Sequence, residues 1–265
     1  YRRYAFLFKP LFRSLHAAGV HNETDAERLA ELGCDRKIII VTGNMKFDGT
    51  ATPDADTIDA RALLREIGVP DEAPVLVAGS TFEGEEELLC KLLPQWRKEH
   101  PDLFLVLVPR HFERARAVLE NLKPLNLRIR RRTAMNAGAG KPDVLLVDTT
   151  GELKAFYEVA TLVFVGKSLT AQGGQNPIEP AALGRPMVFG PFMQNFKPVV
   201  QSLLEAKAAI QVKDETELAR QVSVLLGNPE QLAALGTAAR AVVEGNKGAT
   251  QRTSELIGQT LRALG

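Results

Sequence analysis

The sequence predicts an α/β fold, in which a parallel sheet has helices on both faces. Short, uniformly apolar runs alternate with amphipathic segments along most of the chain, and such runs are typical of strands buried on both faces. Strand and helix in alternation imply right-handed crossovers between parallel strands. Nearly every apolar run is also followed by a glycine, proline or polar turn. Such turns are expected where strands end at a ligand-binding edge.

The elements are predicted in order from these patterns. Strands are expected at 38–41, 75–78, 104–108, 144–147, 162–165, 187–189 and 209–212. Helices are expected at 23–32, after a cap at Asn22 or Thr24, and at 57–67, 84–99, 112–122, 153–160, 178–183 and 196–205. From Glu215 the pattern is helical only, with turn residues at 227–229 and 245–248. Three closing helices are therefore predicted.

The polar, proline-bearing stretch at 43–56 has the composition of an interdomain linker. We therefore expect residues 1–48 to be the end of a preceding domain with its linker, residues 49–245 to form the sheet domain, and residues 246–265 to form a closing helix. The chain begins at Tyr1 within an amphipathic pattern. It is accordingly expected to be a piece of a longer protein.

Composition excludes several classes of protein. The 33 Lys and Arg residues nearly balance the 32 Asp and Glu residues, so there is no general signal for nucleic-acid binding. Cys34 and Cys90 lie far apart and are interpreted as structural, which favours a reducing compartment. No apolar run reaches the roughly 20 residues of a membrane-spanning helix. The motifs of P-loop NTPases, dinucleotide-binding dehydrogenases, zinc peptidases and lipases do not occur.

The ends of the first three sheet strands carry candidate ligand-binding residues. Gly79, Ser80 and Thr81 follow one strand, and their pattern fits ligand contact as well as helix capping. Arg110 and His111 follow the next strand. Arginine offers a planar fork of donors for phosphate or carboxylate, with a surface salt bridge as the alternative, whereas a lone histidine is more often a structural group. The turn at 148–153, with Gly151, Glu152 and Leu153, follows the third strand and offers N–H groups to a base or a phosphate.

The stretch 165–191 is the most informative part of the sequence for a ligand-binding site. It sets a Gly-Gly-Gln-Asn-Pro turn, with Gly173, Gly174 and Asn176, between a buried strand and a short helix. N–H groups of such a turn and of a first helical turn can bind an anion, so we expect a phosphate here. Glu179, early in the helix, is placed to accept hydrogen bonds from sugar hydroxyls. The stretch is therefore interpreted as half of a sugar-nucleotide site.

Seven motifs in order resemble those of the 3-deoxy-D-manno-octulosonic acid (Kdo) transferases of lipid A biosynthesis. The motifs are GNMKFD (43–48), AGSTFEGEEE (78–87), VPRHFER (108–114), DTTGEL (148–153), FVGKSL (164–169), GGQNPIEPA (173–181) and GP-x3-NF (190–196). The resemblance extends over nearly the whole chain. It implies a GT-B glycosyltransferase, in which two Rossmann-like domains face each other and the C-terminal one binds the nucleotide sugar. This chain would be that C-terminal domain together with the last elements of the N-terminal domain.

The resemblance implies transfer of Kdo from CMP-Kdo to a lipid A precursor at the cytoplasmic face of the inner membrane, with no cofactor and no metal. Arg110 would hold the phosphate or the sugar carboxylate, the 151–153 turn would meet the cytidine, Glu179 would bind the ribose, and Lys46 would face the donor. The full set of implied donor-binding residues is Lys46, Ser80, Thr81, Arg110, His111, Gly151, Glu152, Leu153, Ser168, Gly173, Gly174, Asn176, Glu179 and Asn195. The general base and the acceptor site are expected in the preceding domain, outside this chain, so the fragment alone is expected to be soluble and inactive.

Three positions depart from the family pattern: Phe82 and Gln175 stand where the family usually has His, and Lys167 where it usually has Gly. Two other functions stay open, namely a GT-B enzyme acting on a UDP-sugar and a non-catalytic nucleotide-binding module. The basic, aromatic start at 1–15 fits either a membrane surface or packing against a preceding domain, and packing is favoured.

Overall fold

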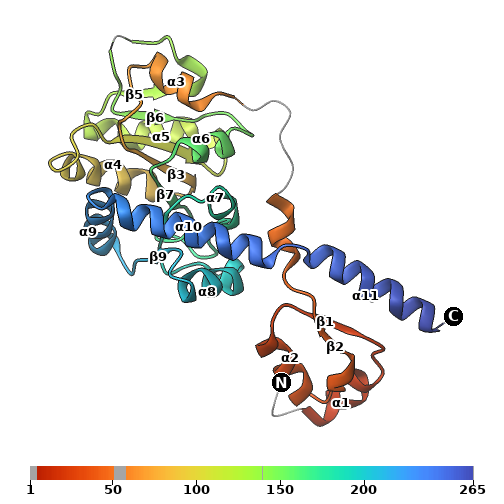
Figure 1. Cartoon of the computed structure of the whole chain (residues 1–265). Helices are drawn as coiled ribbons and strands as arrows, with labels where there is room; N and C mark the ends of the chain where they lie inside the picture. Colours follow the sequence, from red (N-terminus) through yellow and green to blue (C-terminus); the bar gives the residue numbers. More distant parts are fainter. Residues whose placement is uncertain (1–4, 51–57, 139, 265) are drawn as a thin grey trace. The chain divides into compact units, whose positions relative to one another are not determined.

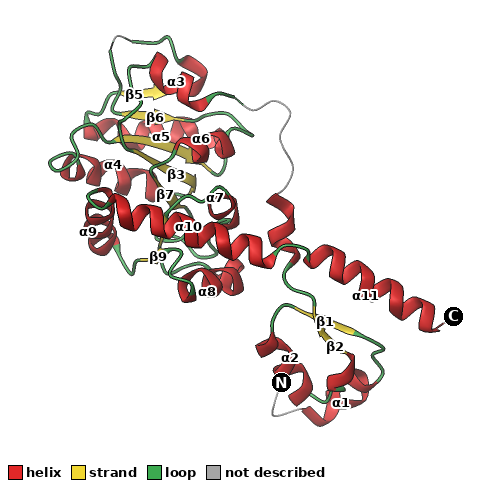
Figure 2. Ribbon diagram, in the orientation of Figure 1, coloured by secondary structure: helices red, strands yellow, loops and turns green. Residues whose placement is uncertain are grey.

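The computed structural model describes residues 5–50, 58–138 and 140–264. Their contacts divide the chain into two compact units, one formed by Tyr1–Pro53 with Val243–Gly265 and the other by Asp54–Val242. The first unit thus combines the beginning of the chain with its closing helix. Figures 1 and 2 show the elements of both units, and each unit is described by itself below.

The second unit is built on a seven-stranded sheet in which every strand pair is parallel. Its strands are β3 (Val75–Thr81), β4 (Phe104–Pro109), β5 (Ile129–Arg131), β6 (Val144–Leu146), β7 (Leu162–Val165), β8 (Met187–Phe189) and β9 (Ile210–Gln211). Their order across the sheet is β5-β6-β4-β3-β7-β8-β9. The chain moves outward from β3 to β4 and then returns across the sheet to β7, so the strand order reverses between β3 and β7. Ligands of such sheets bind at this reversal, beyond the carboxyl ends of the strands.

Helices cover both faces of this sheet (Figure 1). The second unit contains α3 (Ala60–Glu66), α4 (Glu85–Trp96), α5 (Ala115–Leu122), α6 (Leu153–Val159), α7 (Ile178–Ala182), α8 (Lys197–Glu205), α9 (Glu215–Leu226) and most of α10 (Pro229–Asn246). Short 3-10 turns lie at Phe112–Arg114, Lys123–Leu125, Arg132–Ala134 and Gln194–Phe196. Because right-handed crossovers on the two sides of the reversal run in opposite directions, they place α4 and α6 on opposite faces.

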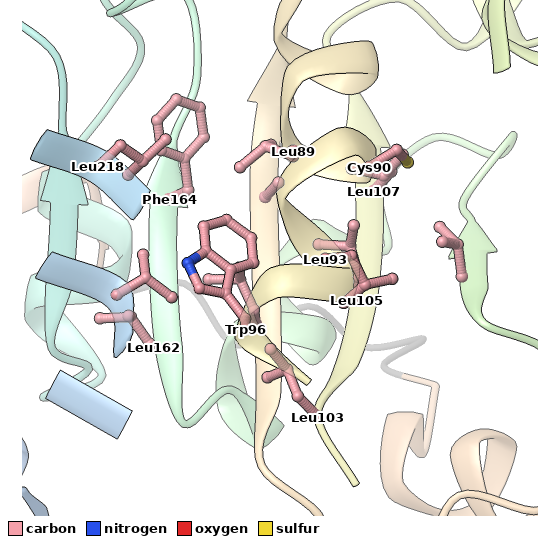
Figure 3. Packing of buried hydrophobic residues seen from close by; sticks show 14 of the residues in the cluster. Leu89, Cys90, Leu93, Trp96, Leu103, Leu105, Leu107, Leu162, Phe164 and Leu218 are labelled. Carbon is pink, nitrogen blue, oxygen red and sulfur yellow. The ribbon is translucent and has the colours of Figure 1, made fainter. Parts of the chain in front are cut away.

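A large core cluster lies between the sheet and α4, α5 and α9 (Figure 3). Trp96, at the end of α4, is fully buried in it, and its indole N–H donates to the carbonyl of Ala219 in α9 at 2.9 Å. A buried Trp needs such a partner for its polar tip. Cys90 lies in the same cluster as a free cysteine, and burial raises the pKa of its thiol to about 12. The interpretation of Cys90 as a structural residue agrees with this environment.

The predicted fold class is confirmed. Every predicted strand and helix occurs, with ends that shift by a few residues, and β3 continues three residues past its predicted end. Two strands were not predicted, β1 (Ala18–Val20) and β5. The strand β5 is an edge strand with two arginines, the buried Arg130 and the exposed Arg131, so it lacks the apolar run that identified the others.

The first unit contains α1 (Ala5–Arg13), β1, α2 (Glu23–Glu31), the 3-10 turn Arg36–Ile38, β2 (Ile39–Val41), the 3-10 turn Met45–Thr50 and α11 (Ala249–Leu264). The strands β1 and β2 pair in parallel, and the predicted cap of α2 forms, since Asn22 Oδ1 accepts from the N–H of Asp25 at 2.8 Å. Asp48 likewise accepts from the N–H groups of Gly248 and Thr250 at the start of α11. Residues 1–4 of the basic start lie outside the described residues. No helix in the described part of the chain is long and apolar enough to cross a membrane.

Asp143 forms hydrogen bonds at the edge of the sheet where the strands begin. These bonds predict that the stability of the fold depends on pH. Its carboxylate accepts from the guanidinium of Arg97 at 2.8 Å, at the end of α4, and from the backbone N–H of Arg128 at 2.9 Å, next to β5. Burial works to raise the pKa of Asp143, but these donors lower it below its ordinary value of 3.8. A lowered pKa stabilises the fold above the ordinary value, and this stability is lost as the pH falls through the folded value.

We expect Asp143→Asn to reduce the free energy of unfolding by about 1 kcal/mol near neutral pH. The difference from the unsubstituted chain should shrink as the pH falls through the lowered pKa of the wild-type carboxylate. Urea unfolding at about pH 6 and about pH 3 measures both values. A difference that stays constant with pH would contradict this role.

Candidate functional site

The sheet brings the predicted ligand-binding loops to one edge. Because all seven strands are parallel, the loops after β3, β4, β6, β7 and β8 leave from their carboxyl ends at the same side. These loops, together with the last residues of β3 and the first turns of the helices that follow, carry thirteen of the fourteen predicted donor-binding residues. The exception is Lys46, an exposed residue of the first unit whose backbone N–H donates to Asn44 Oδ1 at 3.1 Å.

Glu85 joins the loops after β3 and β7. It is the first residue of α4, and its side chain is fully buried. One carboxylate oxygen accepts from the N–H groups of Ser168 and Leu169 at 2.9 and 3.1 Å, and the other accepts from Lys167 and Phe82 at 2.7 and 2.9 Å. Burial raises the pKa of Glu85, although the four N–H groups favour its charged form. This carboxylate therefore sets the shape of the crevice at the strand-order reversal.

Glu86, the next residue, holds a second set of partners. Its carboxylate accepts from the hydroxyl of Thr81 at 2.9 Å and from the guanidinium of Arg114 at 2.9 Å, and it is almost completely buried. Glu87 instead pairs on the helix surface with Lys91 at 2.6 Å. Acidic residues in a first helical turn commonly complement the helix dipole while they face solvent. Of the three acidic residues here, Glu87 is partly exposed, whereas Glu85 and Glu86 are buried and point inward to the loops.

Ser80 and Ser168 lie at the ends of neighbouring strands. Ser80 interrupts the register between β3 and β4 and has a left-handed backbone, with φ at 53°. Ser168 is fully buried, and its hydroxyl donates to the carbonyl of Val165 and accepts from the N–H of Gly190. With Thr81 also fully buried, the hydroxyls of Thr81 and Ser168 shape the loops, and Ser80 is the most accessible of the three.

The glycine turn at 173–175 is built differently from the prediction. The N–H of Gly173 donates to Gln194 Oε1 at 2.9 Å, that of Gly174 to the carbonyl of Lys167 at 2.8 Å, and that of Gln175 to the carbonyl of Gly166 at 3.1 Å. The expectation that these N–H groups are open to a phosphate is therefore wrong. Moreover, α7 has only five residues, so it has at most a small dipole. An anion beside residues 173–175 would therefore be held by donors other than these three N–H groups.

Glu179 lies half-buried in the first turn of α7. Its Oε1 accepts from the side-chain amide of Asn176 at 2.9 Å, and Asn176 Oδ1 accepts in turn from the N–H of Ile178. Glu179 also lies close to Tyr157 of α6, whose hydroxyl pKa is raised by burial and further by the negative charge of Glu179. The second carboxylate oxygen of Glu179 accepts no hydrogen bond from the described residues, so it can accept one from a ligand hydroxyl.

Arg110 and His111 follow β4 and are both exposed. The backbone N–H of Arg110 donates to the carbonyl of Thr81 at 3.0 Å, which fixes the loop next to the end of β3. Among the residues that the structure describes, no carboxylate lies within ion-pair distance of the Arg110 guanidinium. His111 caps the short turn Phe112–Arg114 with its backbone only. The surface salt bridge considered for Arg110 is thus not formed.

The turn after β6 is held by two arginines from the end of β5. The Glu152 carboxylate accepts from Arg132 at 3.0 Å and from the hydroxyl of Thr149 at 2.7 Å, and the Asp148 carboxylate accepts from Thr133. Arg131 lies 3.8 Å from Asp148. The carboxylate of Glu152 therefore positions the turn, while Gly151 and Leu153 are at least partly exposed beside it.

The loop after β8 is hydrogen-bonded to the glycine turn. The N–H of Asn195 donates to the carbonyl of Gly173 at 2.9 Å, beside the bond from Gly173 to Gln194. The side chain of Asn195 is exposed at the same place. The loops after β7 and β8 are thus one connected structure. No group of His, Cys, Asp and Glu suited to a metal ion occurs within residues 5–50, 58–138 and 140–264.

Sequence reasoning did not assign Glu85, Glu86 and Arg114 to the site. Acidic residues in a first helical turn are commonly explained by the helix dipole. The sequence alone does not show which of these carboxylates is buried and which is exposed. The only available signal was their position directly after a strand end.

Comparisons with known proteins agree with this architecture. Residues 1–49 match the family described as 3-Deoxy-D-manno-octulosonic-acid transferase (kdotransferase). The 3-deoxy-D-manno-octulosonic acid transferase of Haemophilus influenzae is 32% identical over 249 residues, which cover 93% of this chain and 57% of that protein. The transferase of the same name from Bordetella pertussis is 34% identical over 242 residues, covering 89% of this chain and 54% of that protein. The chain thus spans a little over half the length of these relatives.

A solved structure is similar over about two thirds of the chain. The C-terminal CMP-Kdo binding domain of WaaA from Acinetobacter baumannii aligns with a TM-score of 0.61 at 29% identity, and the alignment covers 69% of this chain and 98% of that domain. The structural similarity thus includes nearly all of a domain whose reported ligand is a nucleotide sugar.

Proposed function

This chain is related to the Kdo transferases along most of its length, and from this premise we propose that it is the donor-binding part of such a glycosyltransferase. It would bind CMP-Kdo, the donor from which Kdo is transferred to a lipid A precursor. The observation that carries the proposal is the alignment with almost the whole of a CMP-Kdo binding domain. The loops of the predicted site also meet at one edge of the sheet, at the reversal of strand order.

The chemistry of the site suits an anionic sugar nucleotide. CMP-Kdo carries one phosphodiester and one sugar carboxylate, and Arg110 offers an exposed guanidinium with no carboxylate partner in the described chain. Glu179 has a carboxylate oxygen for the ribose hydroxyls. The turn with Gly151 and Leu153 provides a place for the cytidine beside Glu152. A single phosphate can be neutralised by a few side-chain donors without a metal ion.

The remaining roles follow from the resemblance and belong to the same proposal. Ser80, His111, Asn176, Asn195 and the glycine turn at 173–174 would line the donor. The acceptor would be a lipid A precursor at the cytoplasmic face of the inner membrane. For this chain alone we propose donor binding without transfer, because it spans 57% and 54% of the two bacterial transferases.

Calorimetric titration of the 265-residue chain with CMP, UMP and UDP tests the proposal. Binding of CMP in preference to the uridine nucleotides is the expected result. If UDP bound and CMP did not, the proposal would be replaced by that of an enzyme acting on a UDP-sugar. No heat with any of the three at millimolar concentration would remove the nucleotide-binding assignment.

Arg110 gives this titration a specific prediction. A charge-assisted hydrogen bond contributes about 1.5–3 kcal/mol, so Arg110→Ala should weaken CMP binding by about tenfold or more. Arg65→Ala is the matched control, since Arg65 carries the same charge near the end of α3, before β3 begins, and forms an ion pair with the exposed Asp71. It should leave CMP affinity unchanged. Equal affinities for both variants would exclude Arg110 from the site.

A further inference from the structure

Lys167 lies in the loop after β7, and its backbone is tightly fixed. It follows β7 after Gly166, and its φ of 53° lies in the left-handed region that disfavours residues with a side chain. Its N–H donates to Glu85 at 2.7 Å, and its carbonyl accepts from the N–H of Gly174 at 2.8 Å. The backbone of Lys167 is therefore held from α4 and from the glycine turn, and the direction of its side chain is set by both.

The side chain reaches from the glycine turn to Phe82. A Cβ placed on Gly173 would lie 3.6 Å from Cε of Lys167 and 3.0 Å from the side-chain amide nitrogen of Asn195, so all three residues meet there. The ammonium nitrogen lies 4.9 Å from the centre of the Phe82 ring, within the range of cation–π attraction. The aromatic ring and the turn thus hold the ammonium at the carboxyl ends of β3, β7 and β8.

The charge of Lys167 is not neutralised in the described part of the chain. Arg114 also faces the Phe82 ring, with its central carbon 5.6 Å away, but Glu86 neutralises it. Glu85, which binds the backbone of Lys167, directs both carboxylate oxygens at N–H groups. No carboxylate of the described residues forms an ion pair with the Lys167 ammonium.

We propose that Lys167 is an anion-binding residue of this site, held over Phe82, which contacts the phosphate or the sugar carboxylate of the donor. This inference rests on the proposed function. The N–H groups of the turn at 173–175 are engaged within the protein, so the positive charge at this turn comes from a side chain. An ammonium that is half-buried and close to the turn supplies that charge. Phe82 acts here as a positioning residue.

The test measures CMP and CMP-Kdo affinities for the complete 265-residue chain and its variants at low and high salt. Lys167→Met removes the charge and keeps most of the length of the side chain. Lys167→Gly removes the charge and suits the left-handed backbone, so it remains informative if the methionine variant folds poorly. Lys167→Arg keeps the charge. Lys98→Met is the matched control, because the exposed Lys98 lies between α4 and β4, at the opposite edge of the sheet.

We expect Lys167→Met and Lys167→Gly to weaken donor binding by about tenfold and to flatten its salt dependence. Lys167→Arg and Lys98→Met should bind nearly as the unsubstituted chain does. Equal losses for CMP and CMP-Kdo identify the phosphate as the contact, and a loss for CMP-Kdo alone identifies the sugar carboxylate. The role of Lys167 is overturned if the unsubstituted chain binds CMP and the charge-removing variants bind both CMP and CMP-Kdo as tightly as it does. A chain that binds neither compound overturns the proposed function instead.

Discussion

Glu85→Gln should reduce the free energy of unfolding by about 2–5 kcal/mol and lower CMP affinity at the same time. Each carboxylate oxygen of Glu85 accepts two backbone N–H groups in a fully buried position. A glutamine has only one acceptor oxygen, so its amide group would face two N–H groups as a donor. Two hydrogen bonds would be lost, and two buried N–H groups would be left unpaired. Chemical unfolding measures the free energy of unfolding, and titration with CMP measures the affinity of the site.

Glu87→Gln is the control for this substitution. Glu87 is two residues further along the same helix, and its partner is the exposed Lys91. Removing an exposed pair of this kind changes stability by less than about 0.5 kcal/mol. If Glu85→Gln and Glu87→Gln changed stability equally, the buried carboxylate would not be what joins the loops after β3 and β7.

Gly166→Ala should destabilise the chain by about 3 kcal/mol or more. A Cβ at Gly166 would lie 2.4 Å from the carbonyl oxygen of Ser80 and 2.6 Å from Cα of Thr81. These are backbone atoms, so the substitution would force the ends of β3 and β7 apart. It would also disturb the N–H of Gln175, which donates to the carbonyl of Gly166. A large fall in the unfolding midpoint, with loss of CMP binding at temperatures where the variant is still folded, is the expected result.

Gly245→Ala is a control for the effect of adding a methyl group. A Cβ at Gly245 meets nothing within 4 Å, and the residue lies in the last turn of α10. Alanine is favoured over glycine by about 0.5–1 kcal/mol in a helix interior, and by less near a helix end. This variant should therefore be slightly more stable than the unsubstituted chain. A neutral Gly166→Ala would show that the close approach of β3 and β7 does not constrain the fold.

Much of the fold was predictable because uniform apolar runs identify buried parallel strands. The run at 162–165 matches β7 residue for residue, and all four of its residues are buried. The strand β5 was not predictable in this way, because an edge strand with two arginines has no apolar run. The strand β1, with a glycine at its centre, gives an equally weak signal.

The candidate site was predictable in position but not in its hydrogen bonds. The order of strands and turns located Arg110 and Glu179 at one edge. It could not show that the N–H groups of the turn at 173–175 bind carbonyl and amide oxygens of the same chain, because these bonds form only when the loop after β7 folds back on itself and the loop after β8 packs against it. The contact between Phe82 and Lys167 could not be predicted from the sequence for the same reason. These residues are 85 positions apart and meet only after β3 and β7 pair.

Mapping of CMP on the isotope-labelled chain by backbone amide chemical shifts tests the central claim most directly. The account predicts that the largest shifts occur in the loops at 80–82, 110–111, 148–153, 166–169 and 173–176, at the carboxyl ends of the strands. Uridine nucleotides should produce weaker shifts at the same concentrations. Shifts confined to the amino-end loops, such as 98–103, or to the first unit would contradict the account, as would unchanged spectra at saturating CMP.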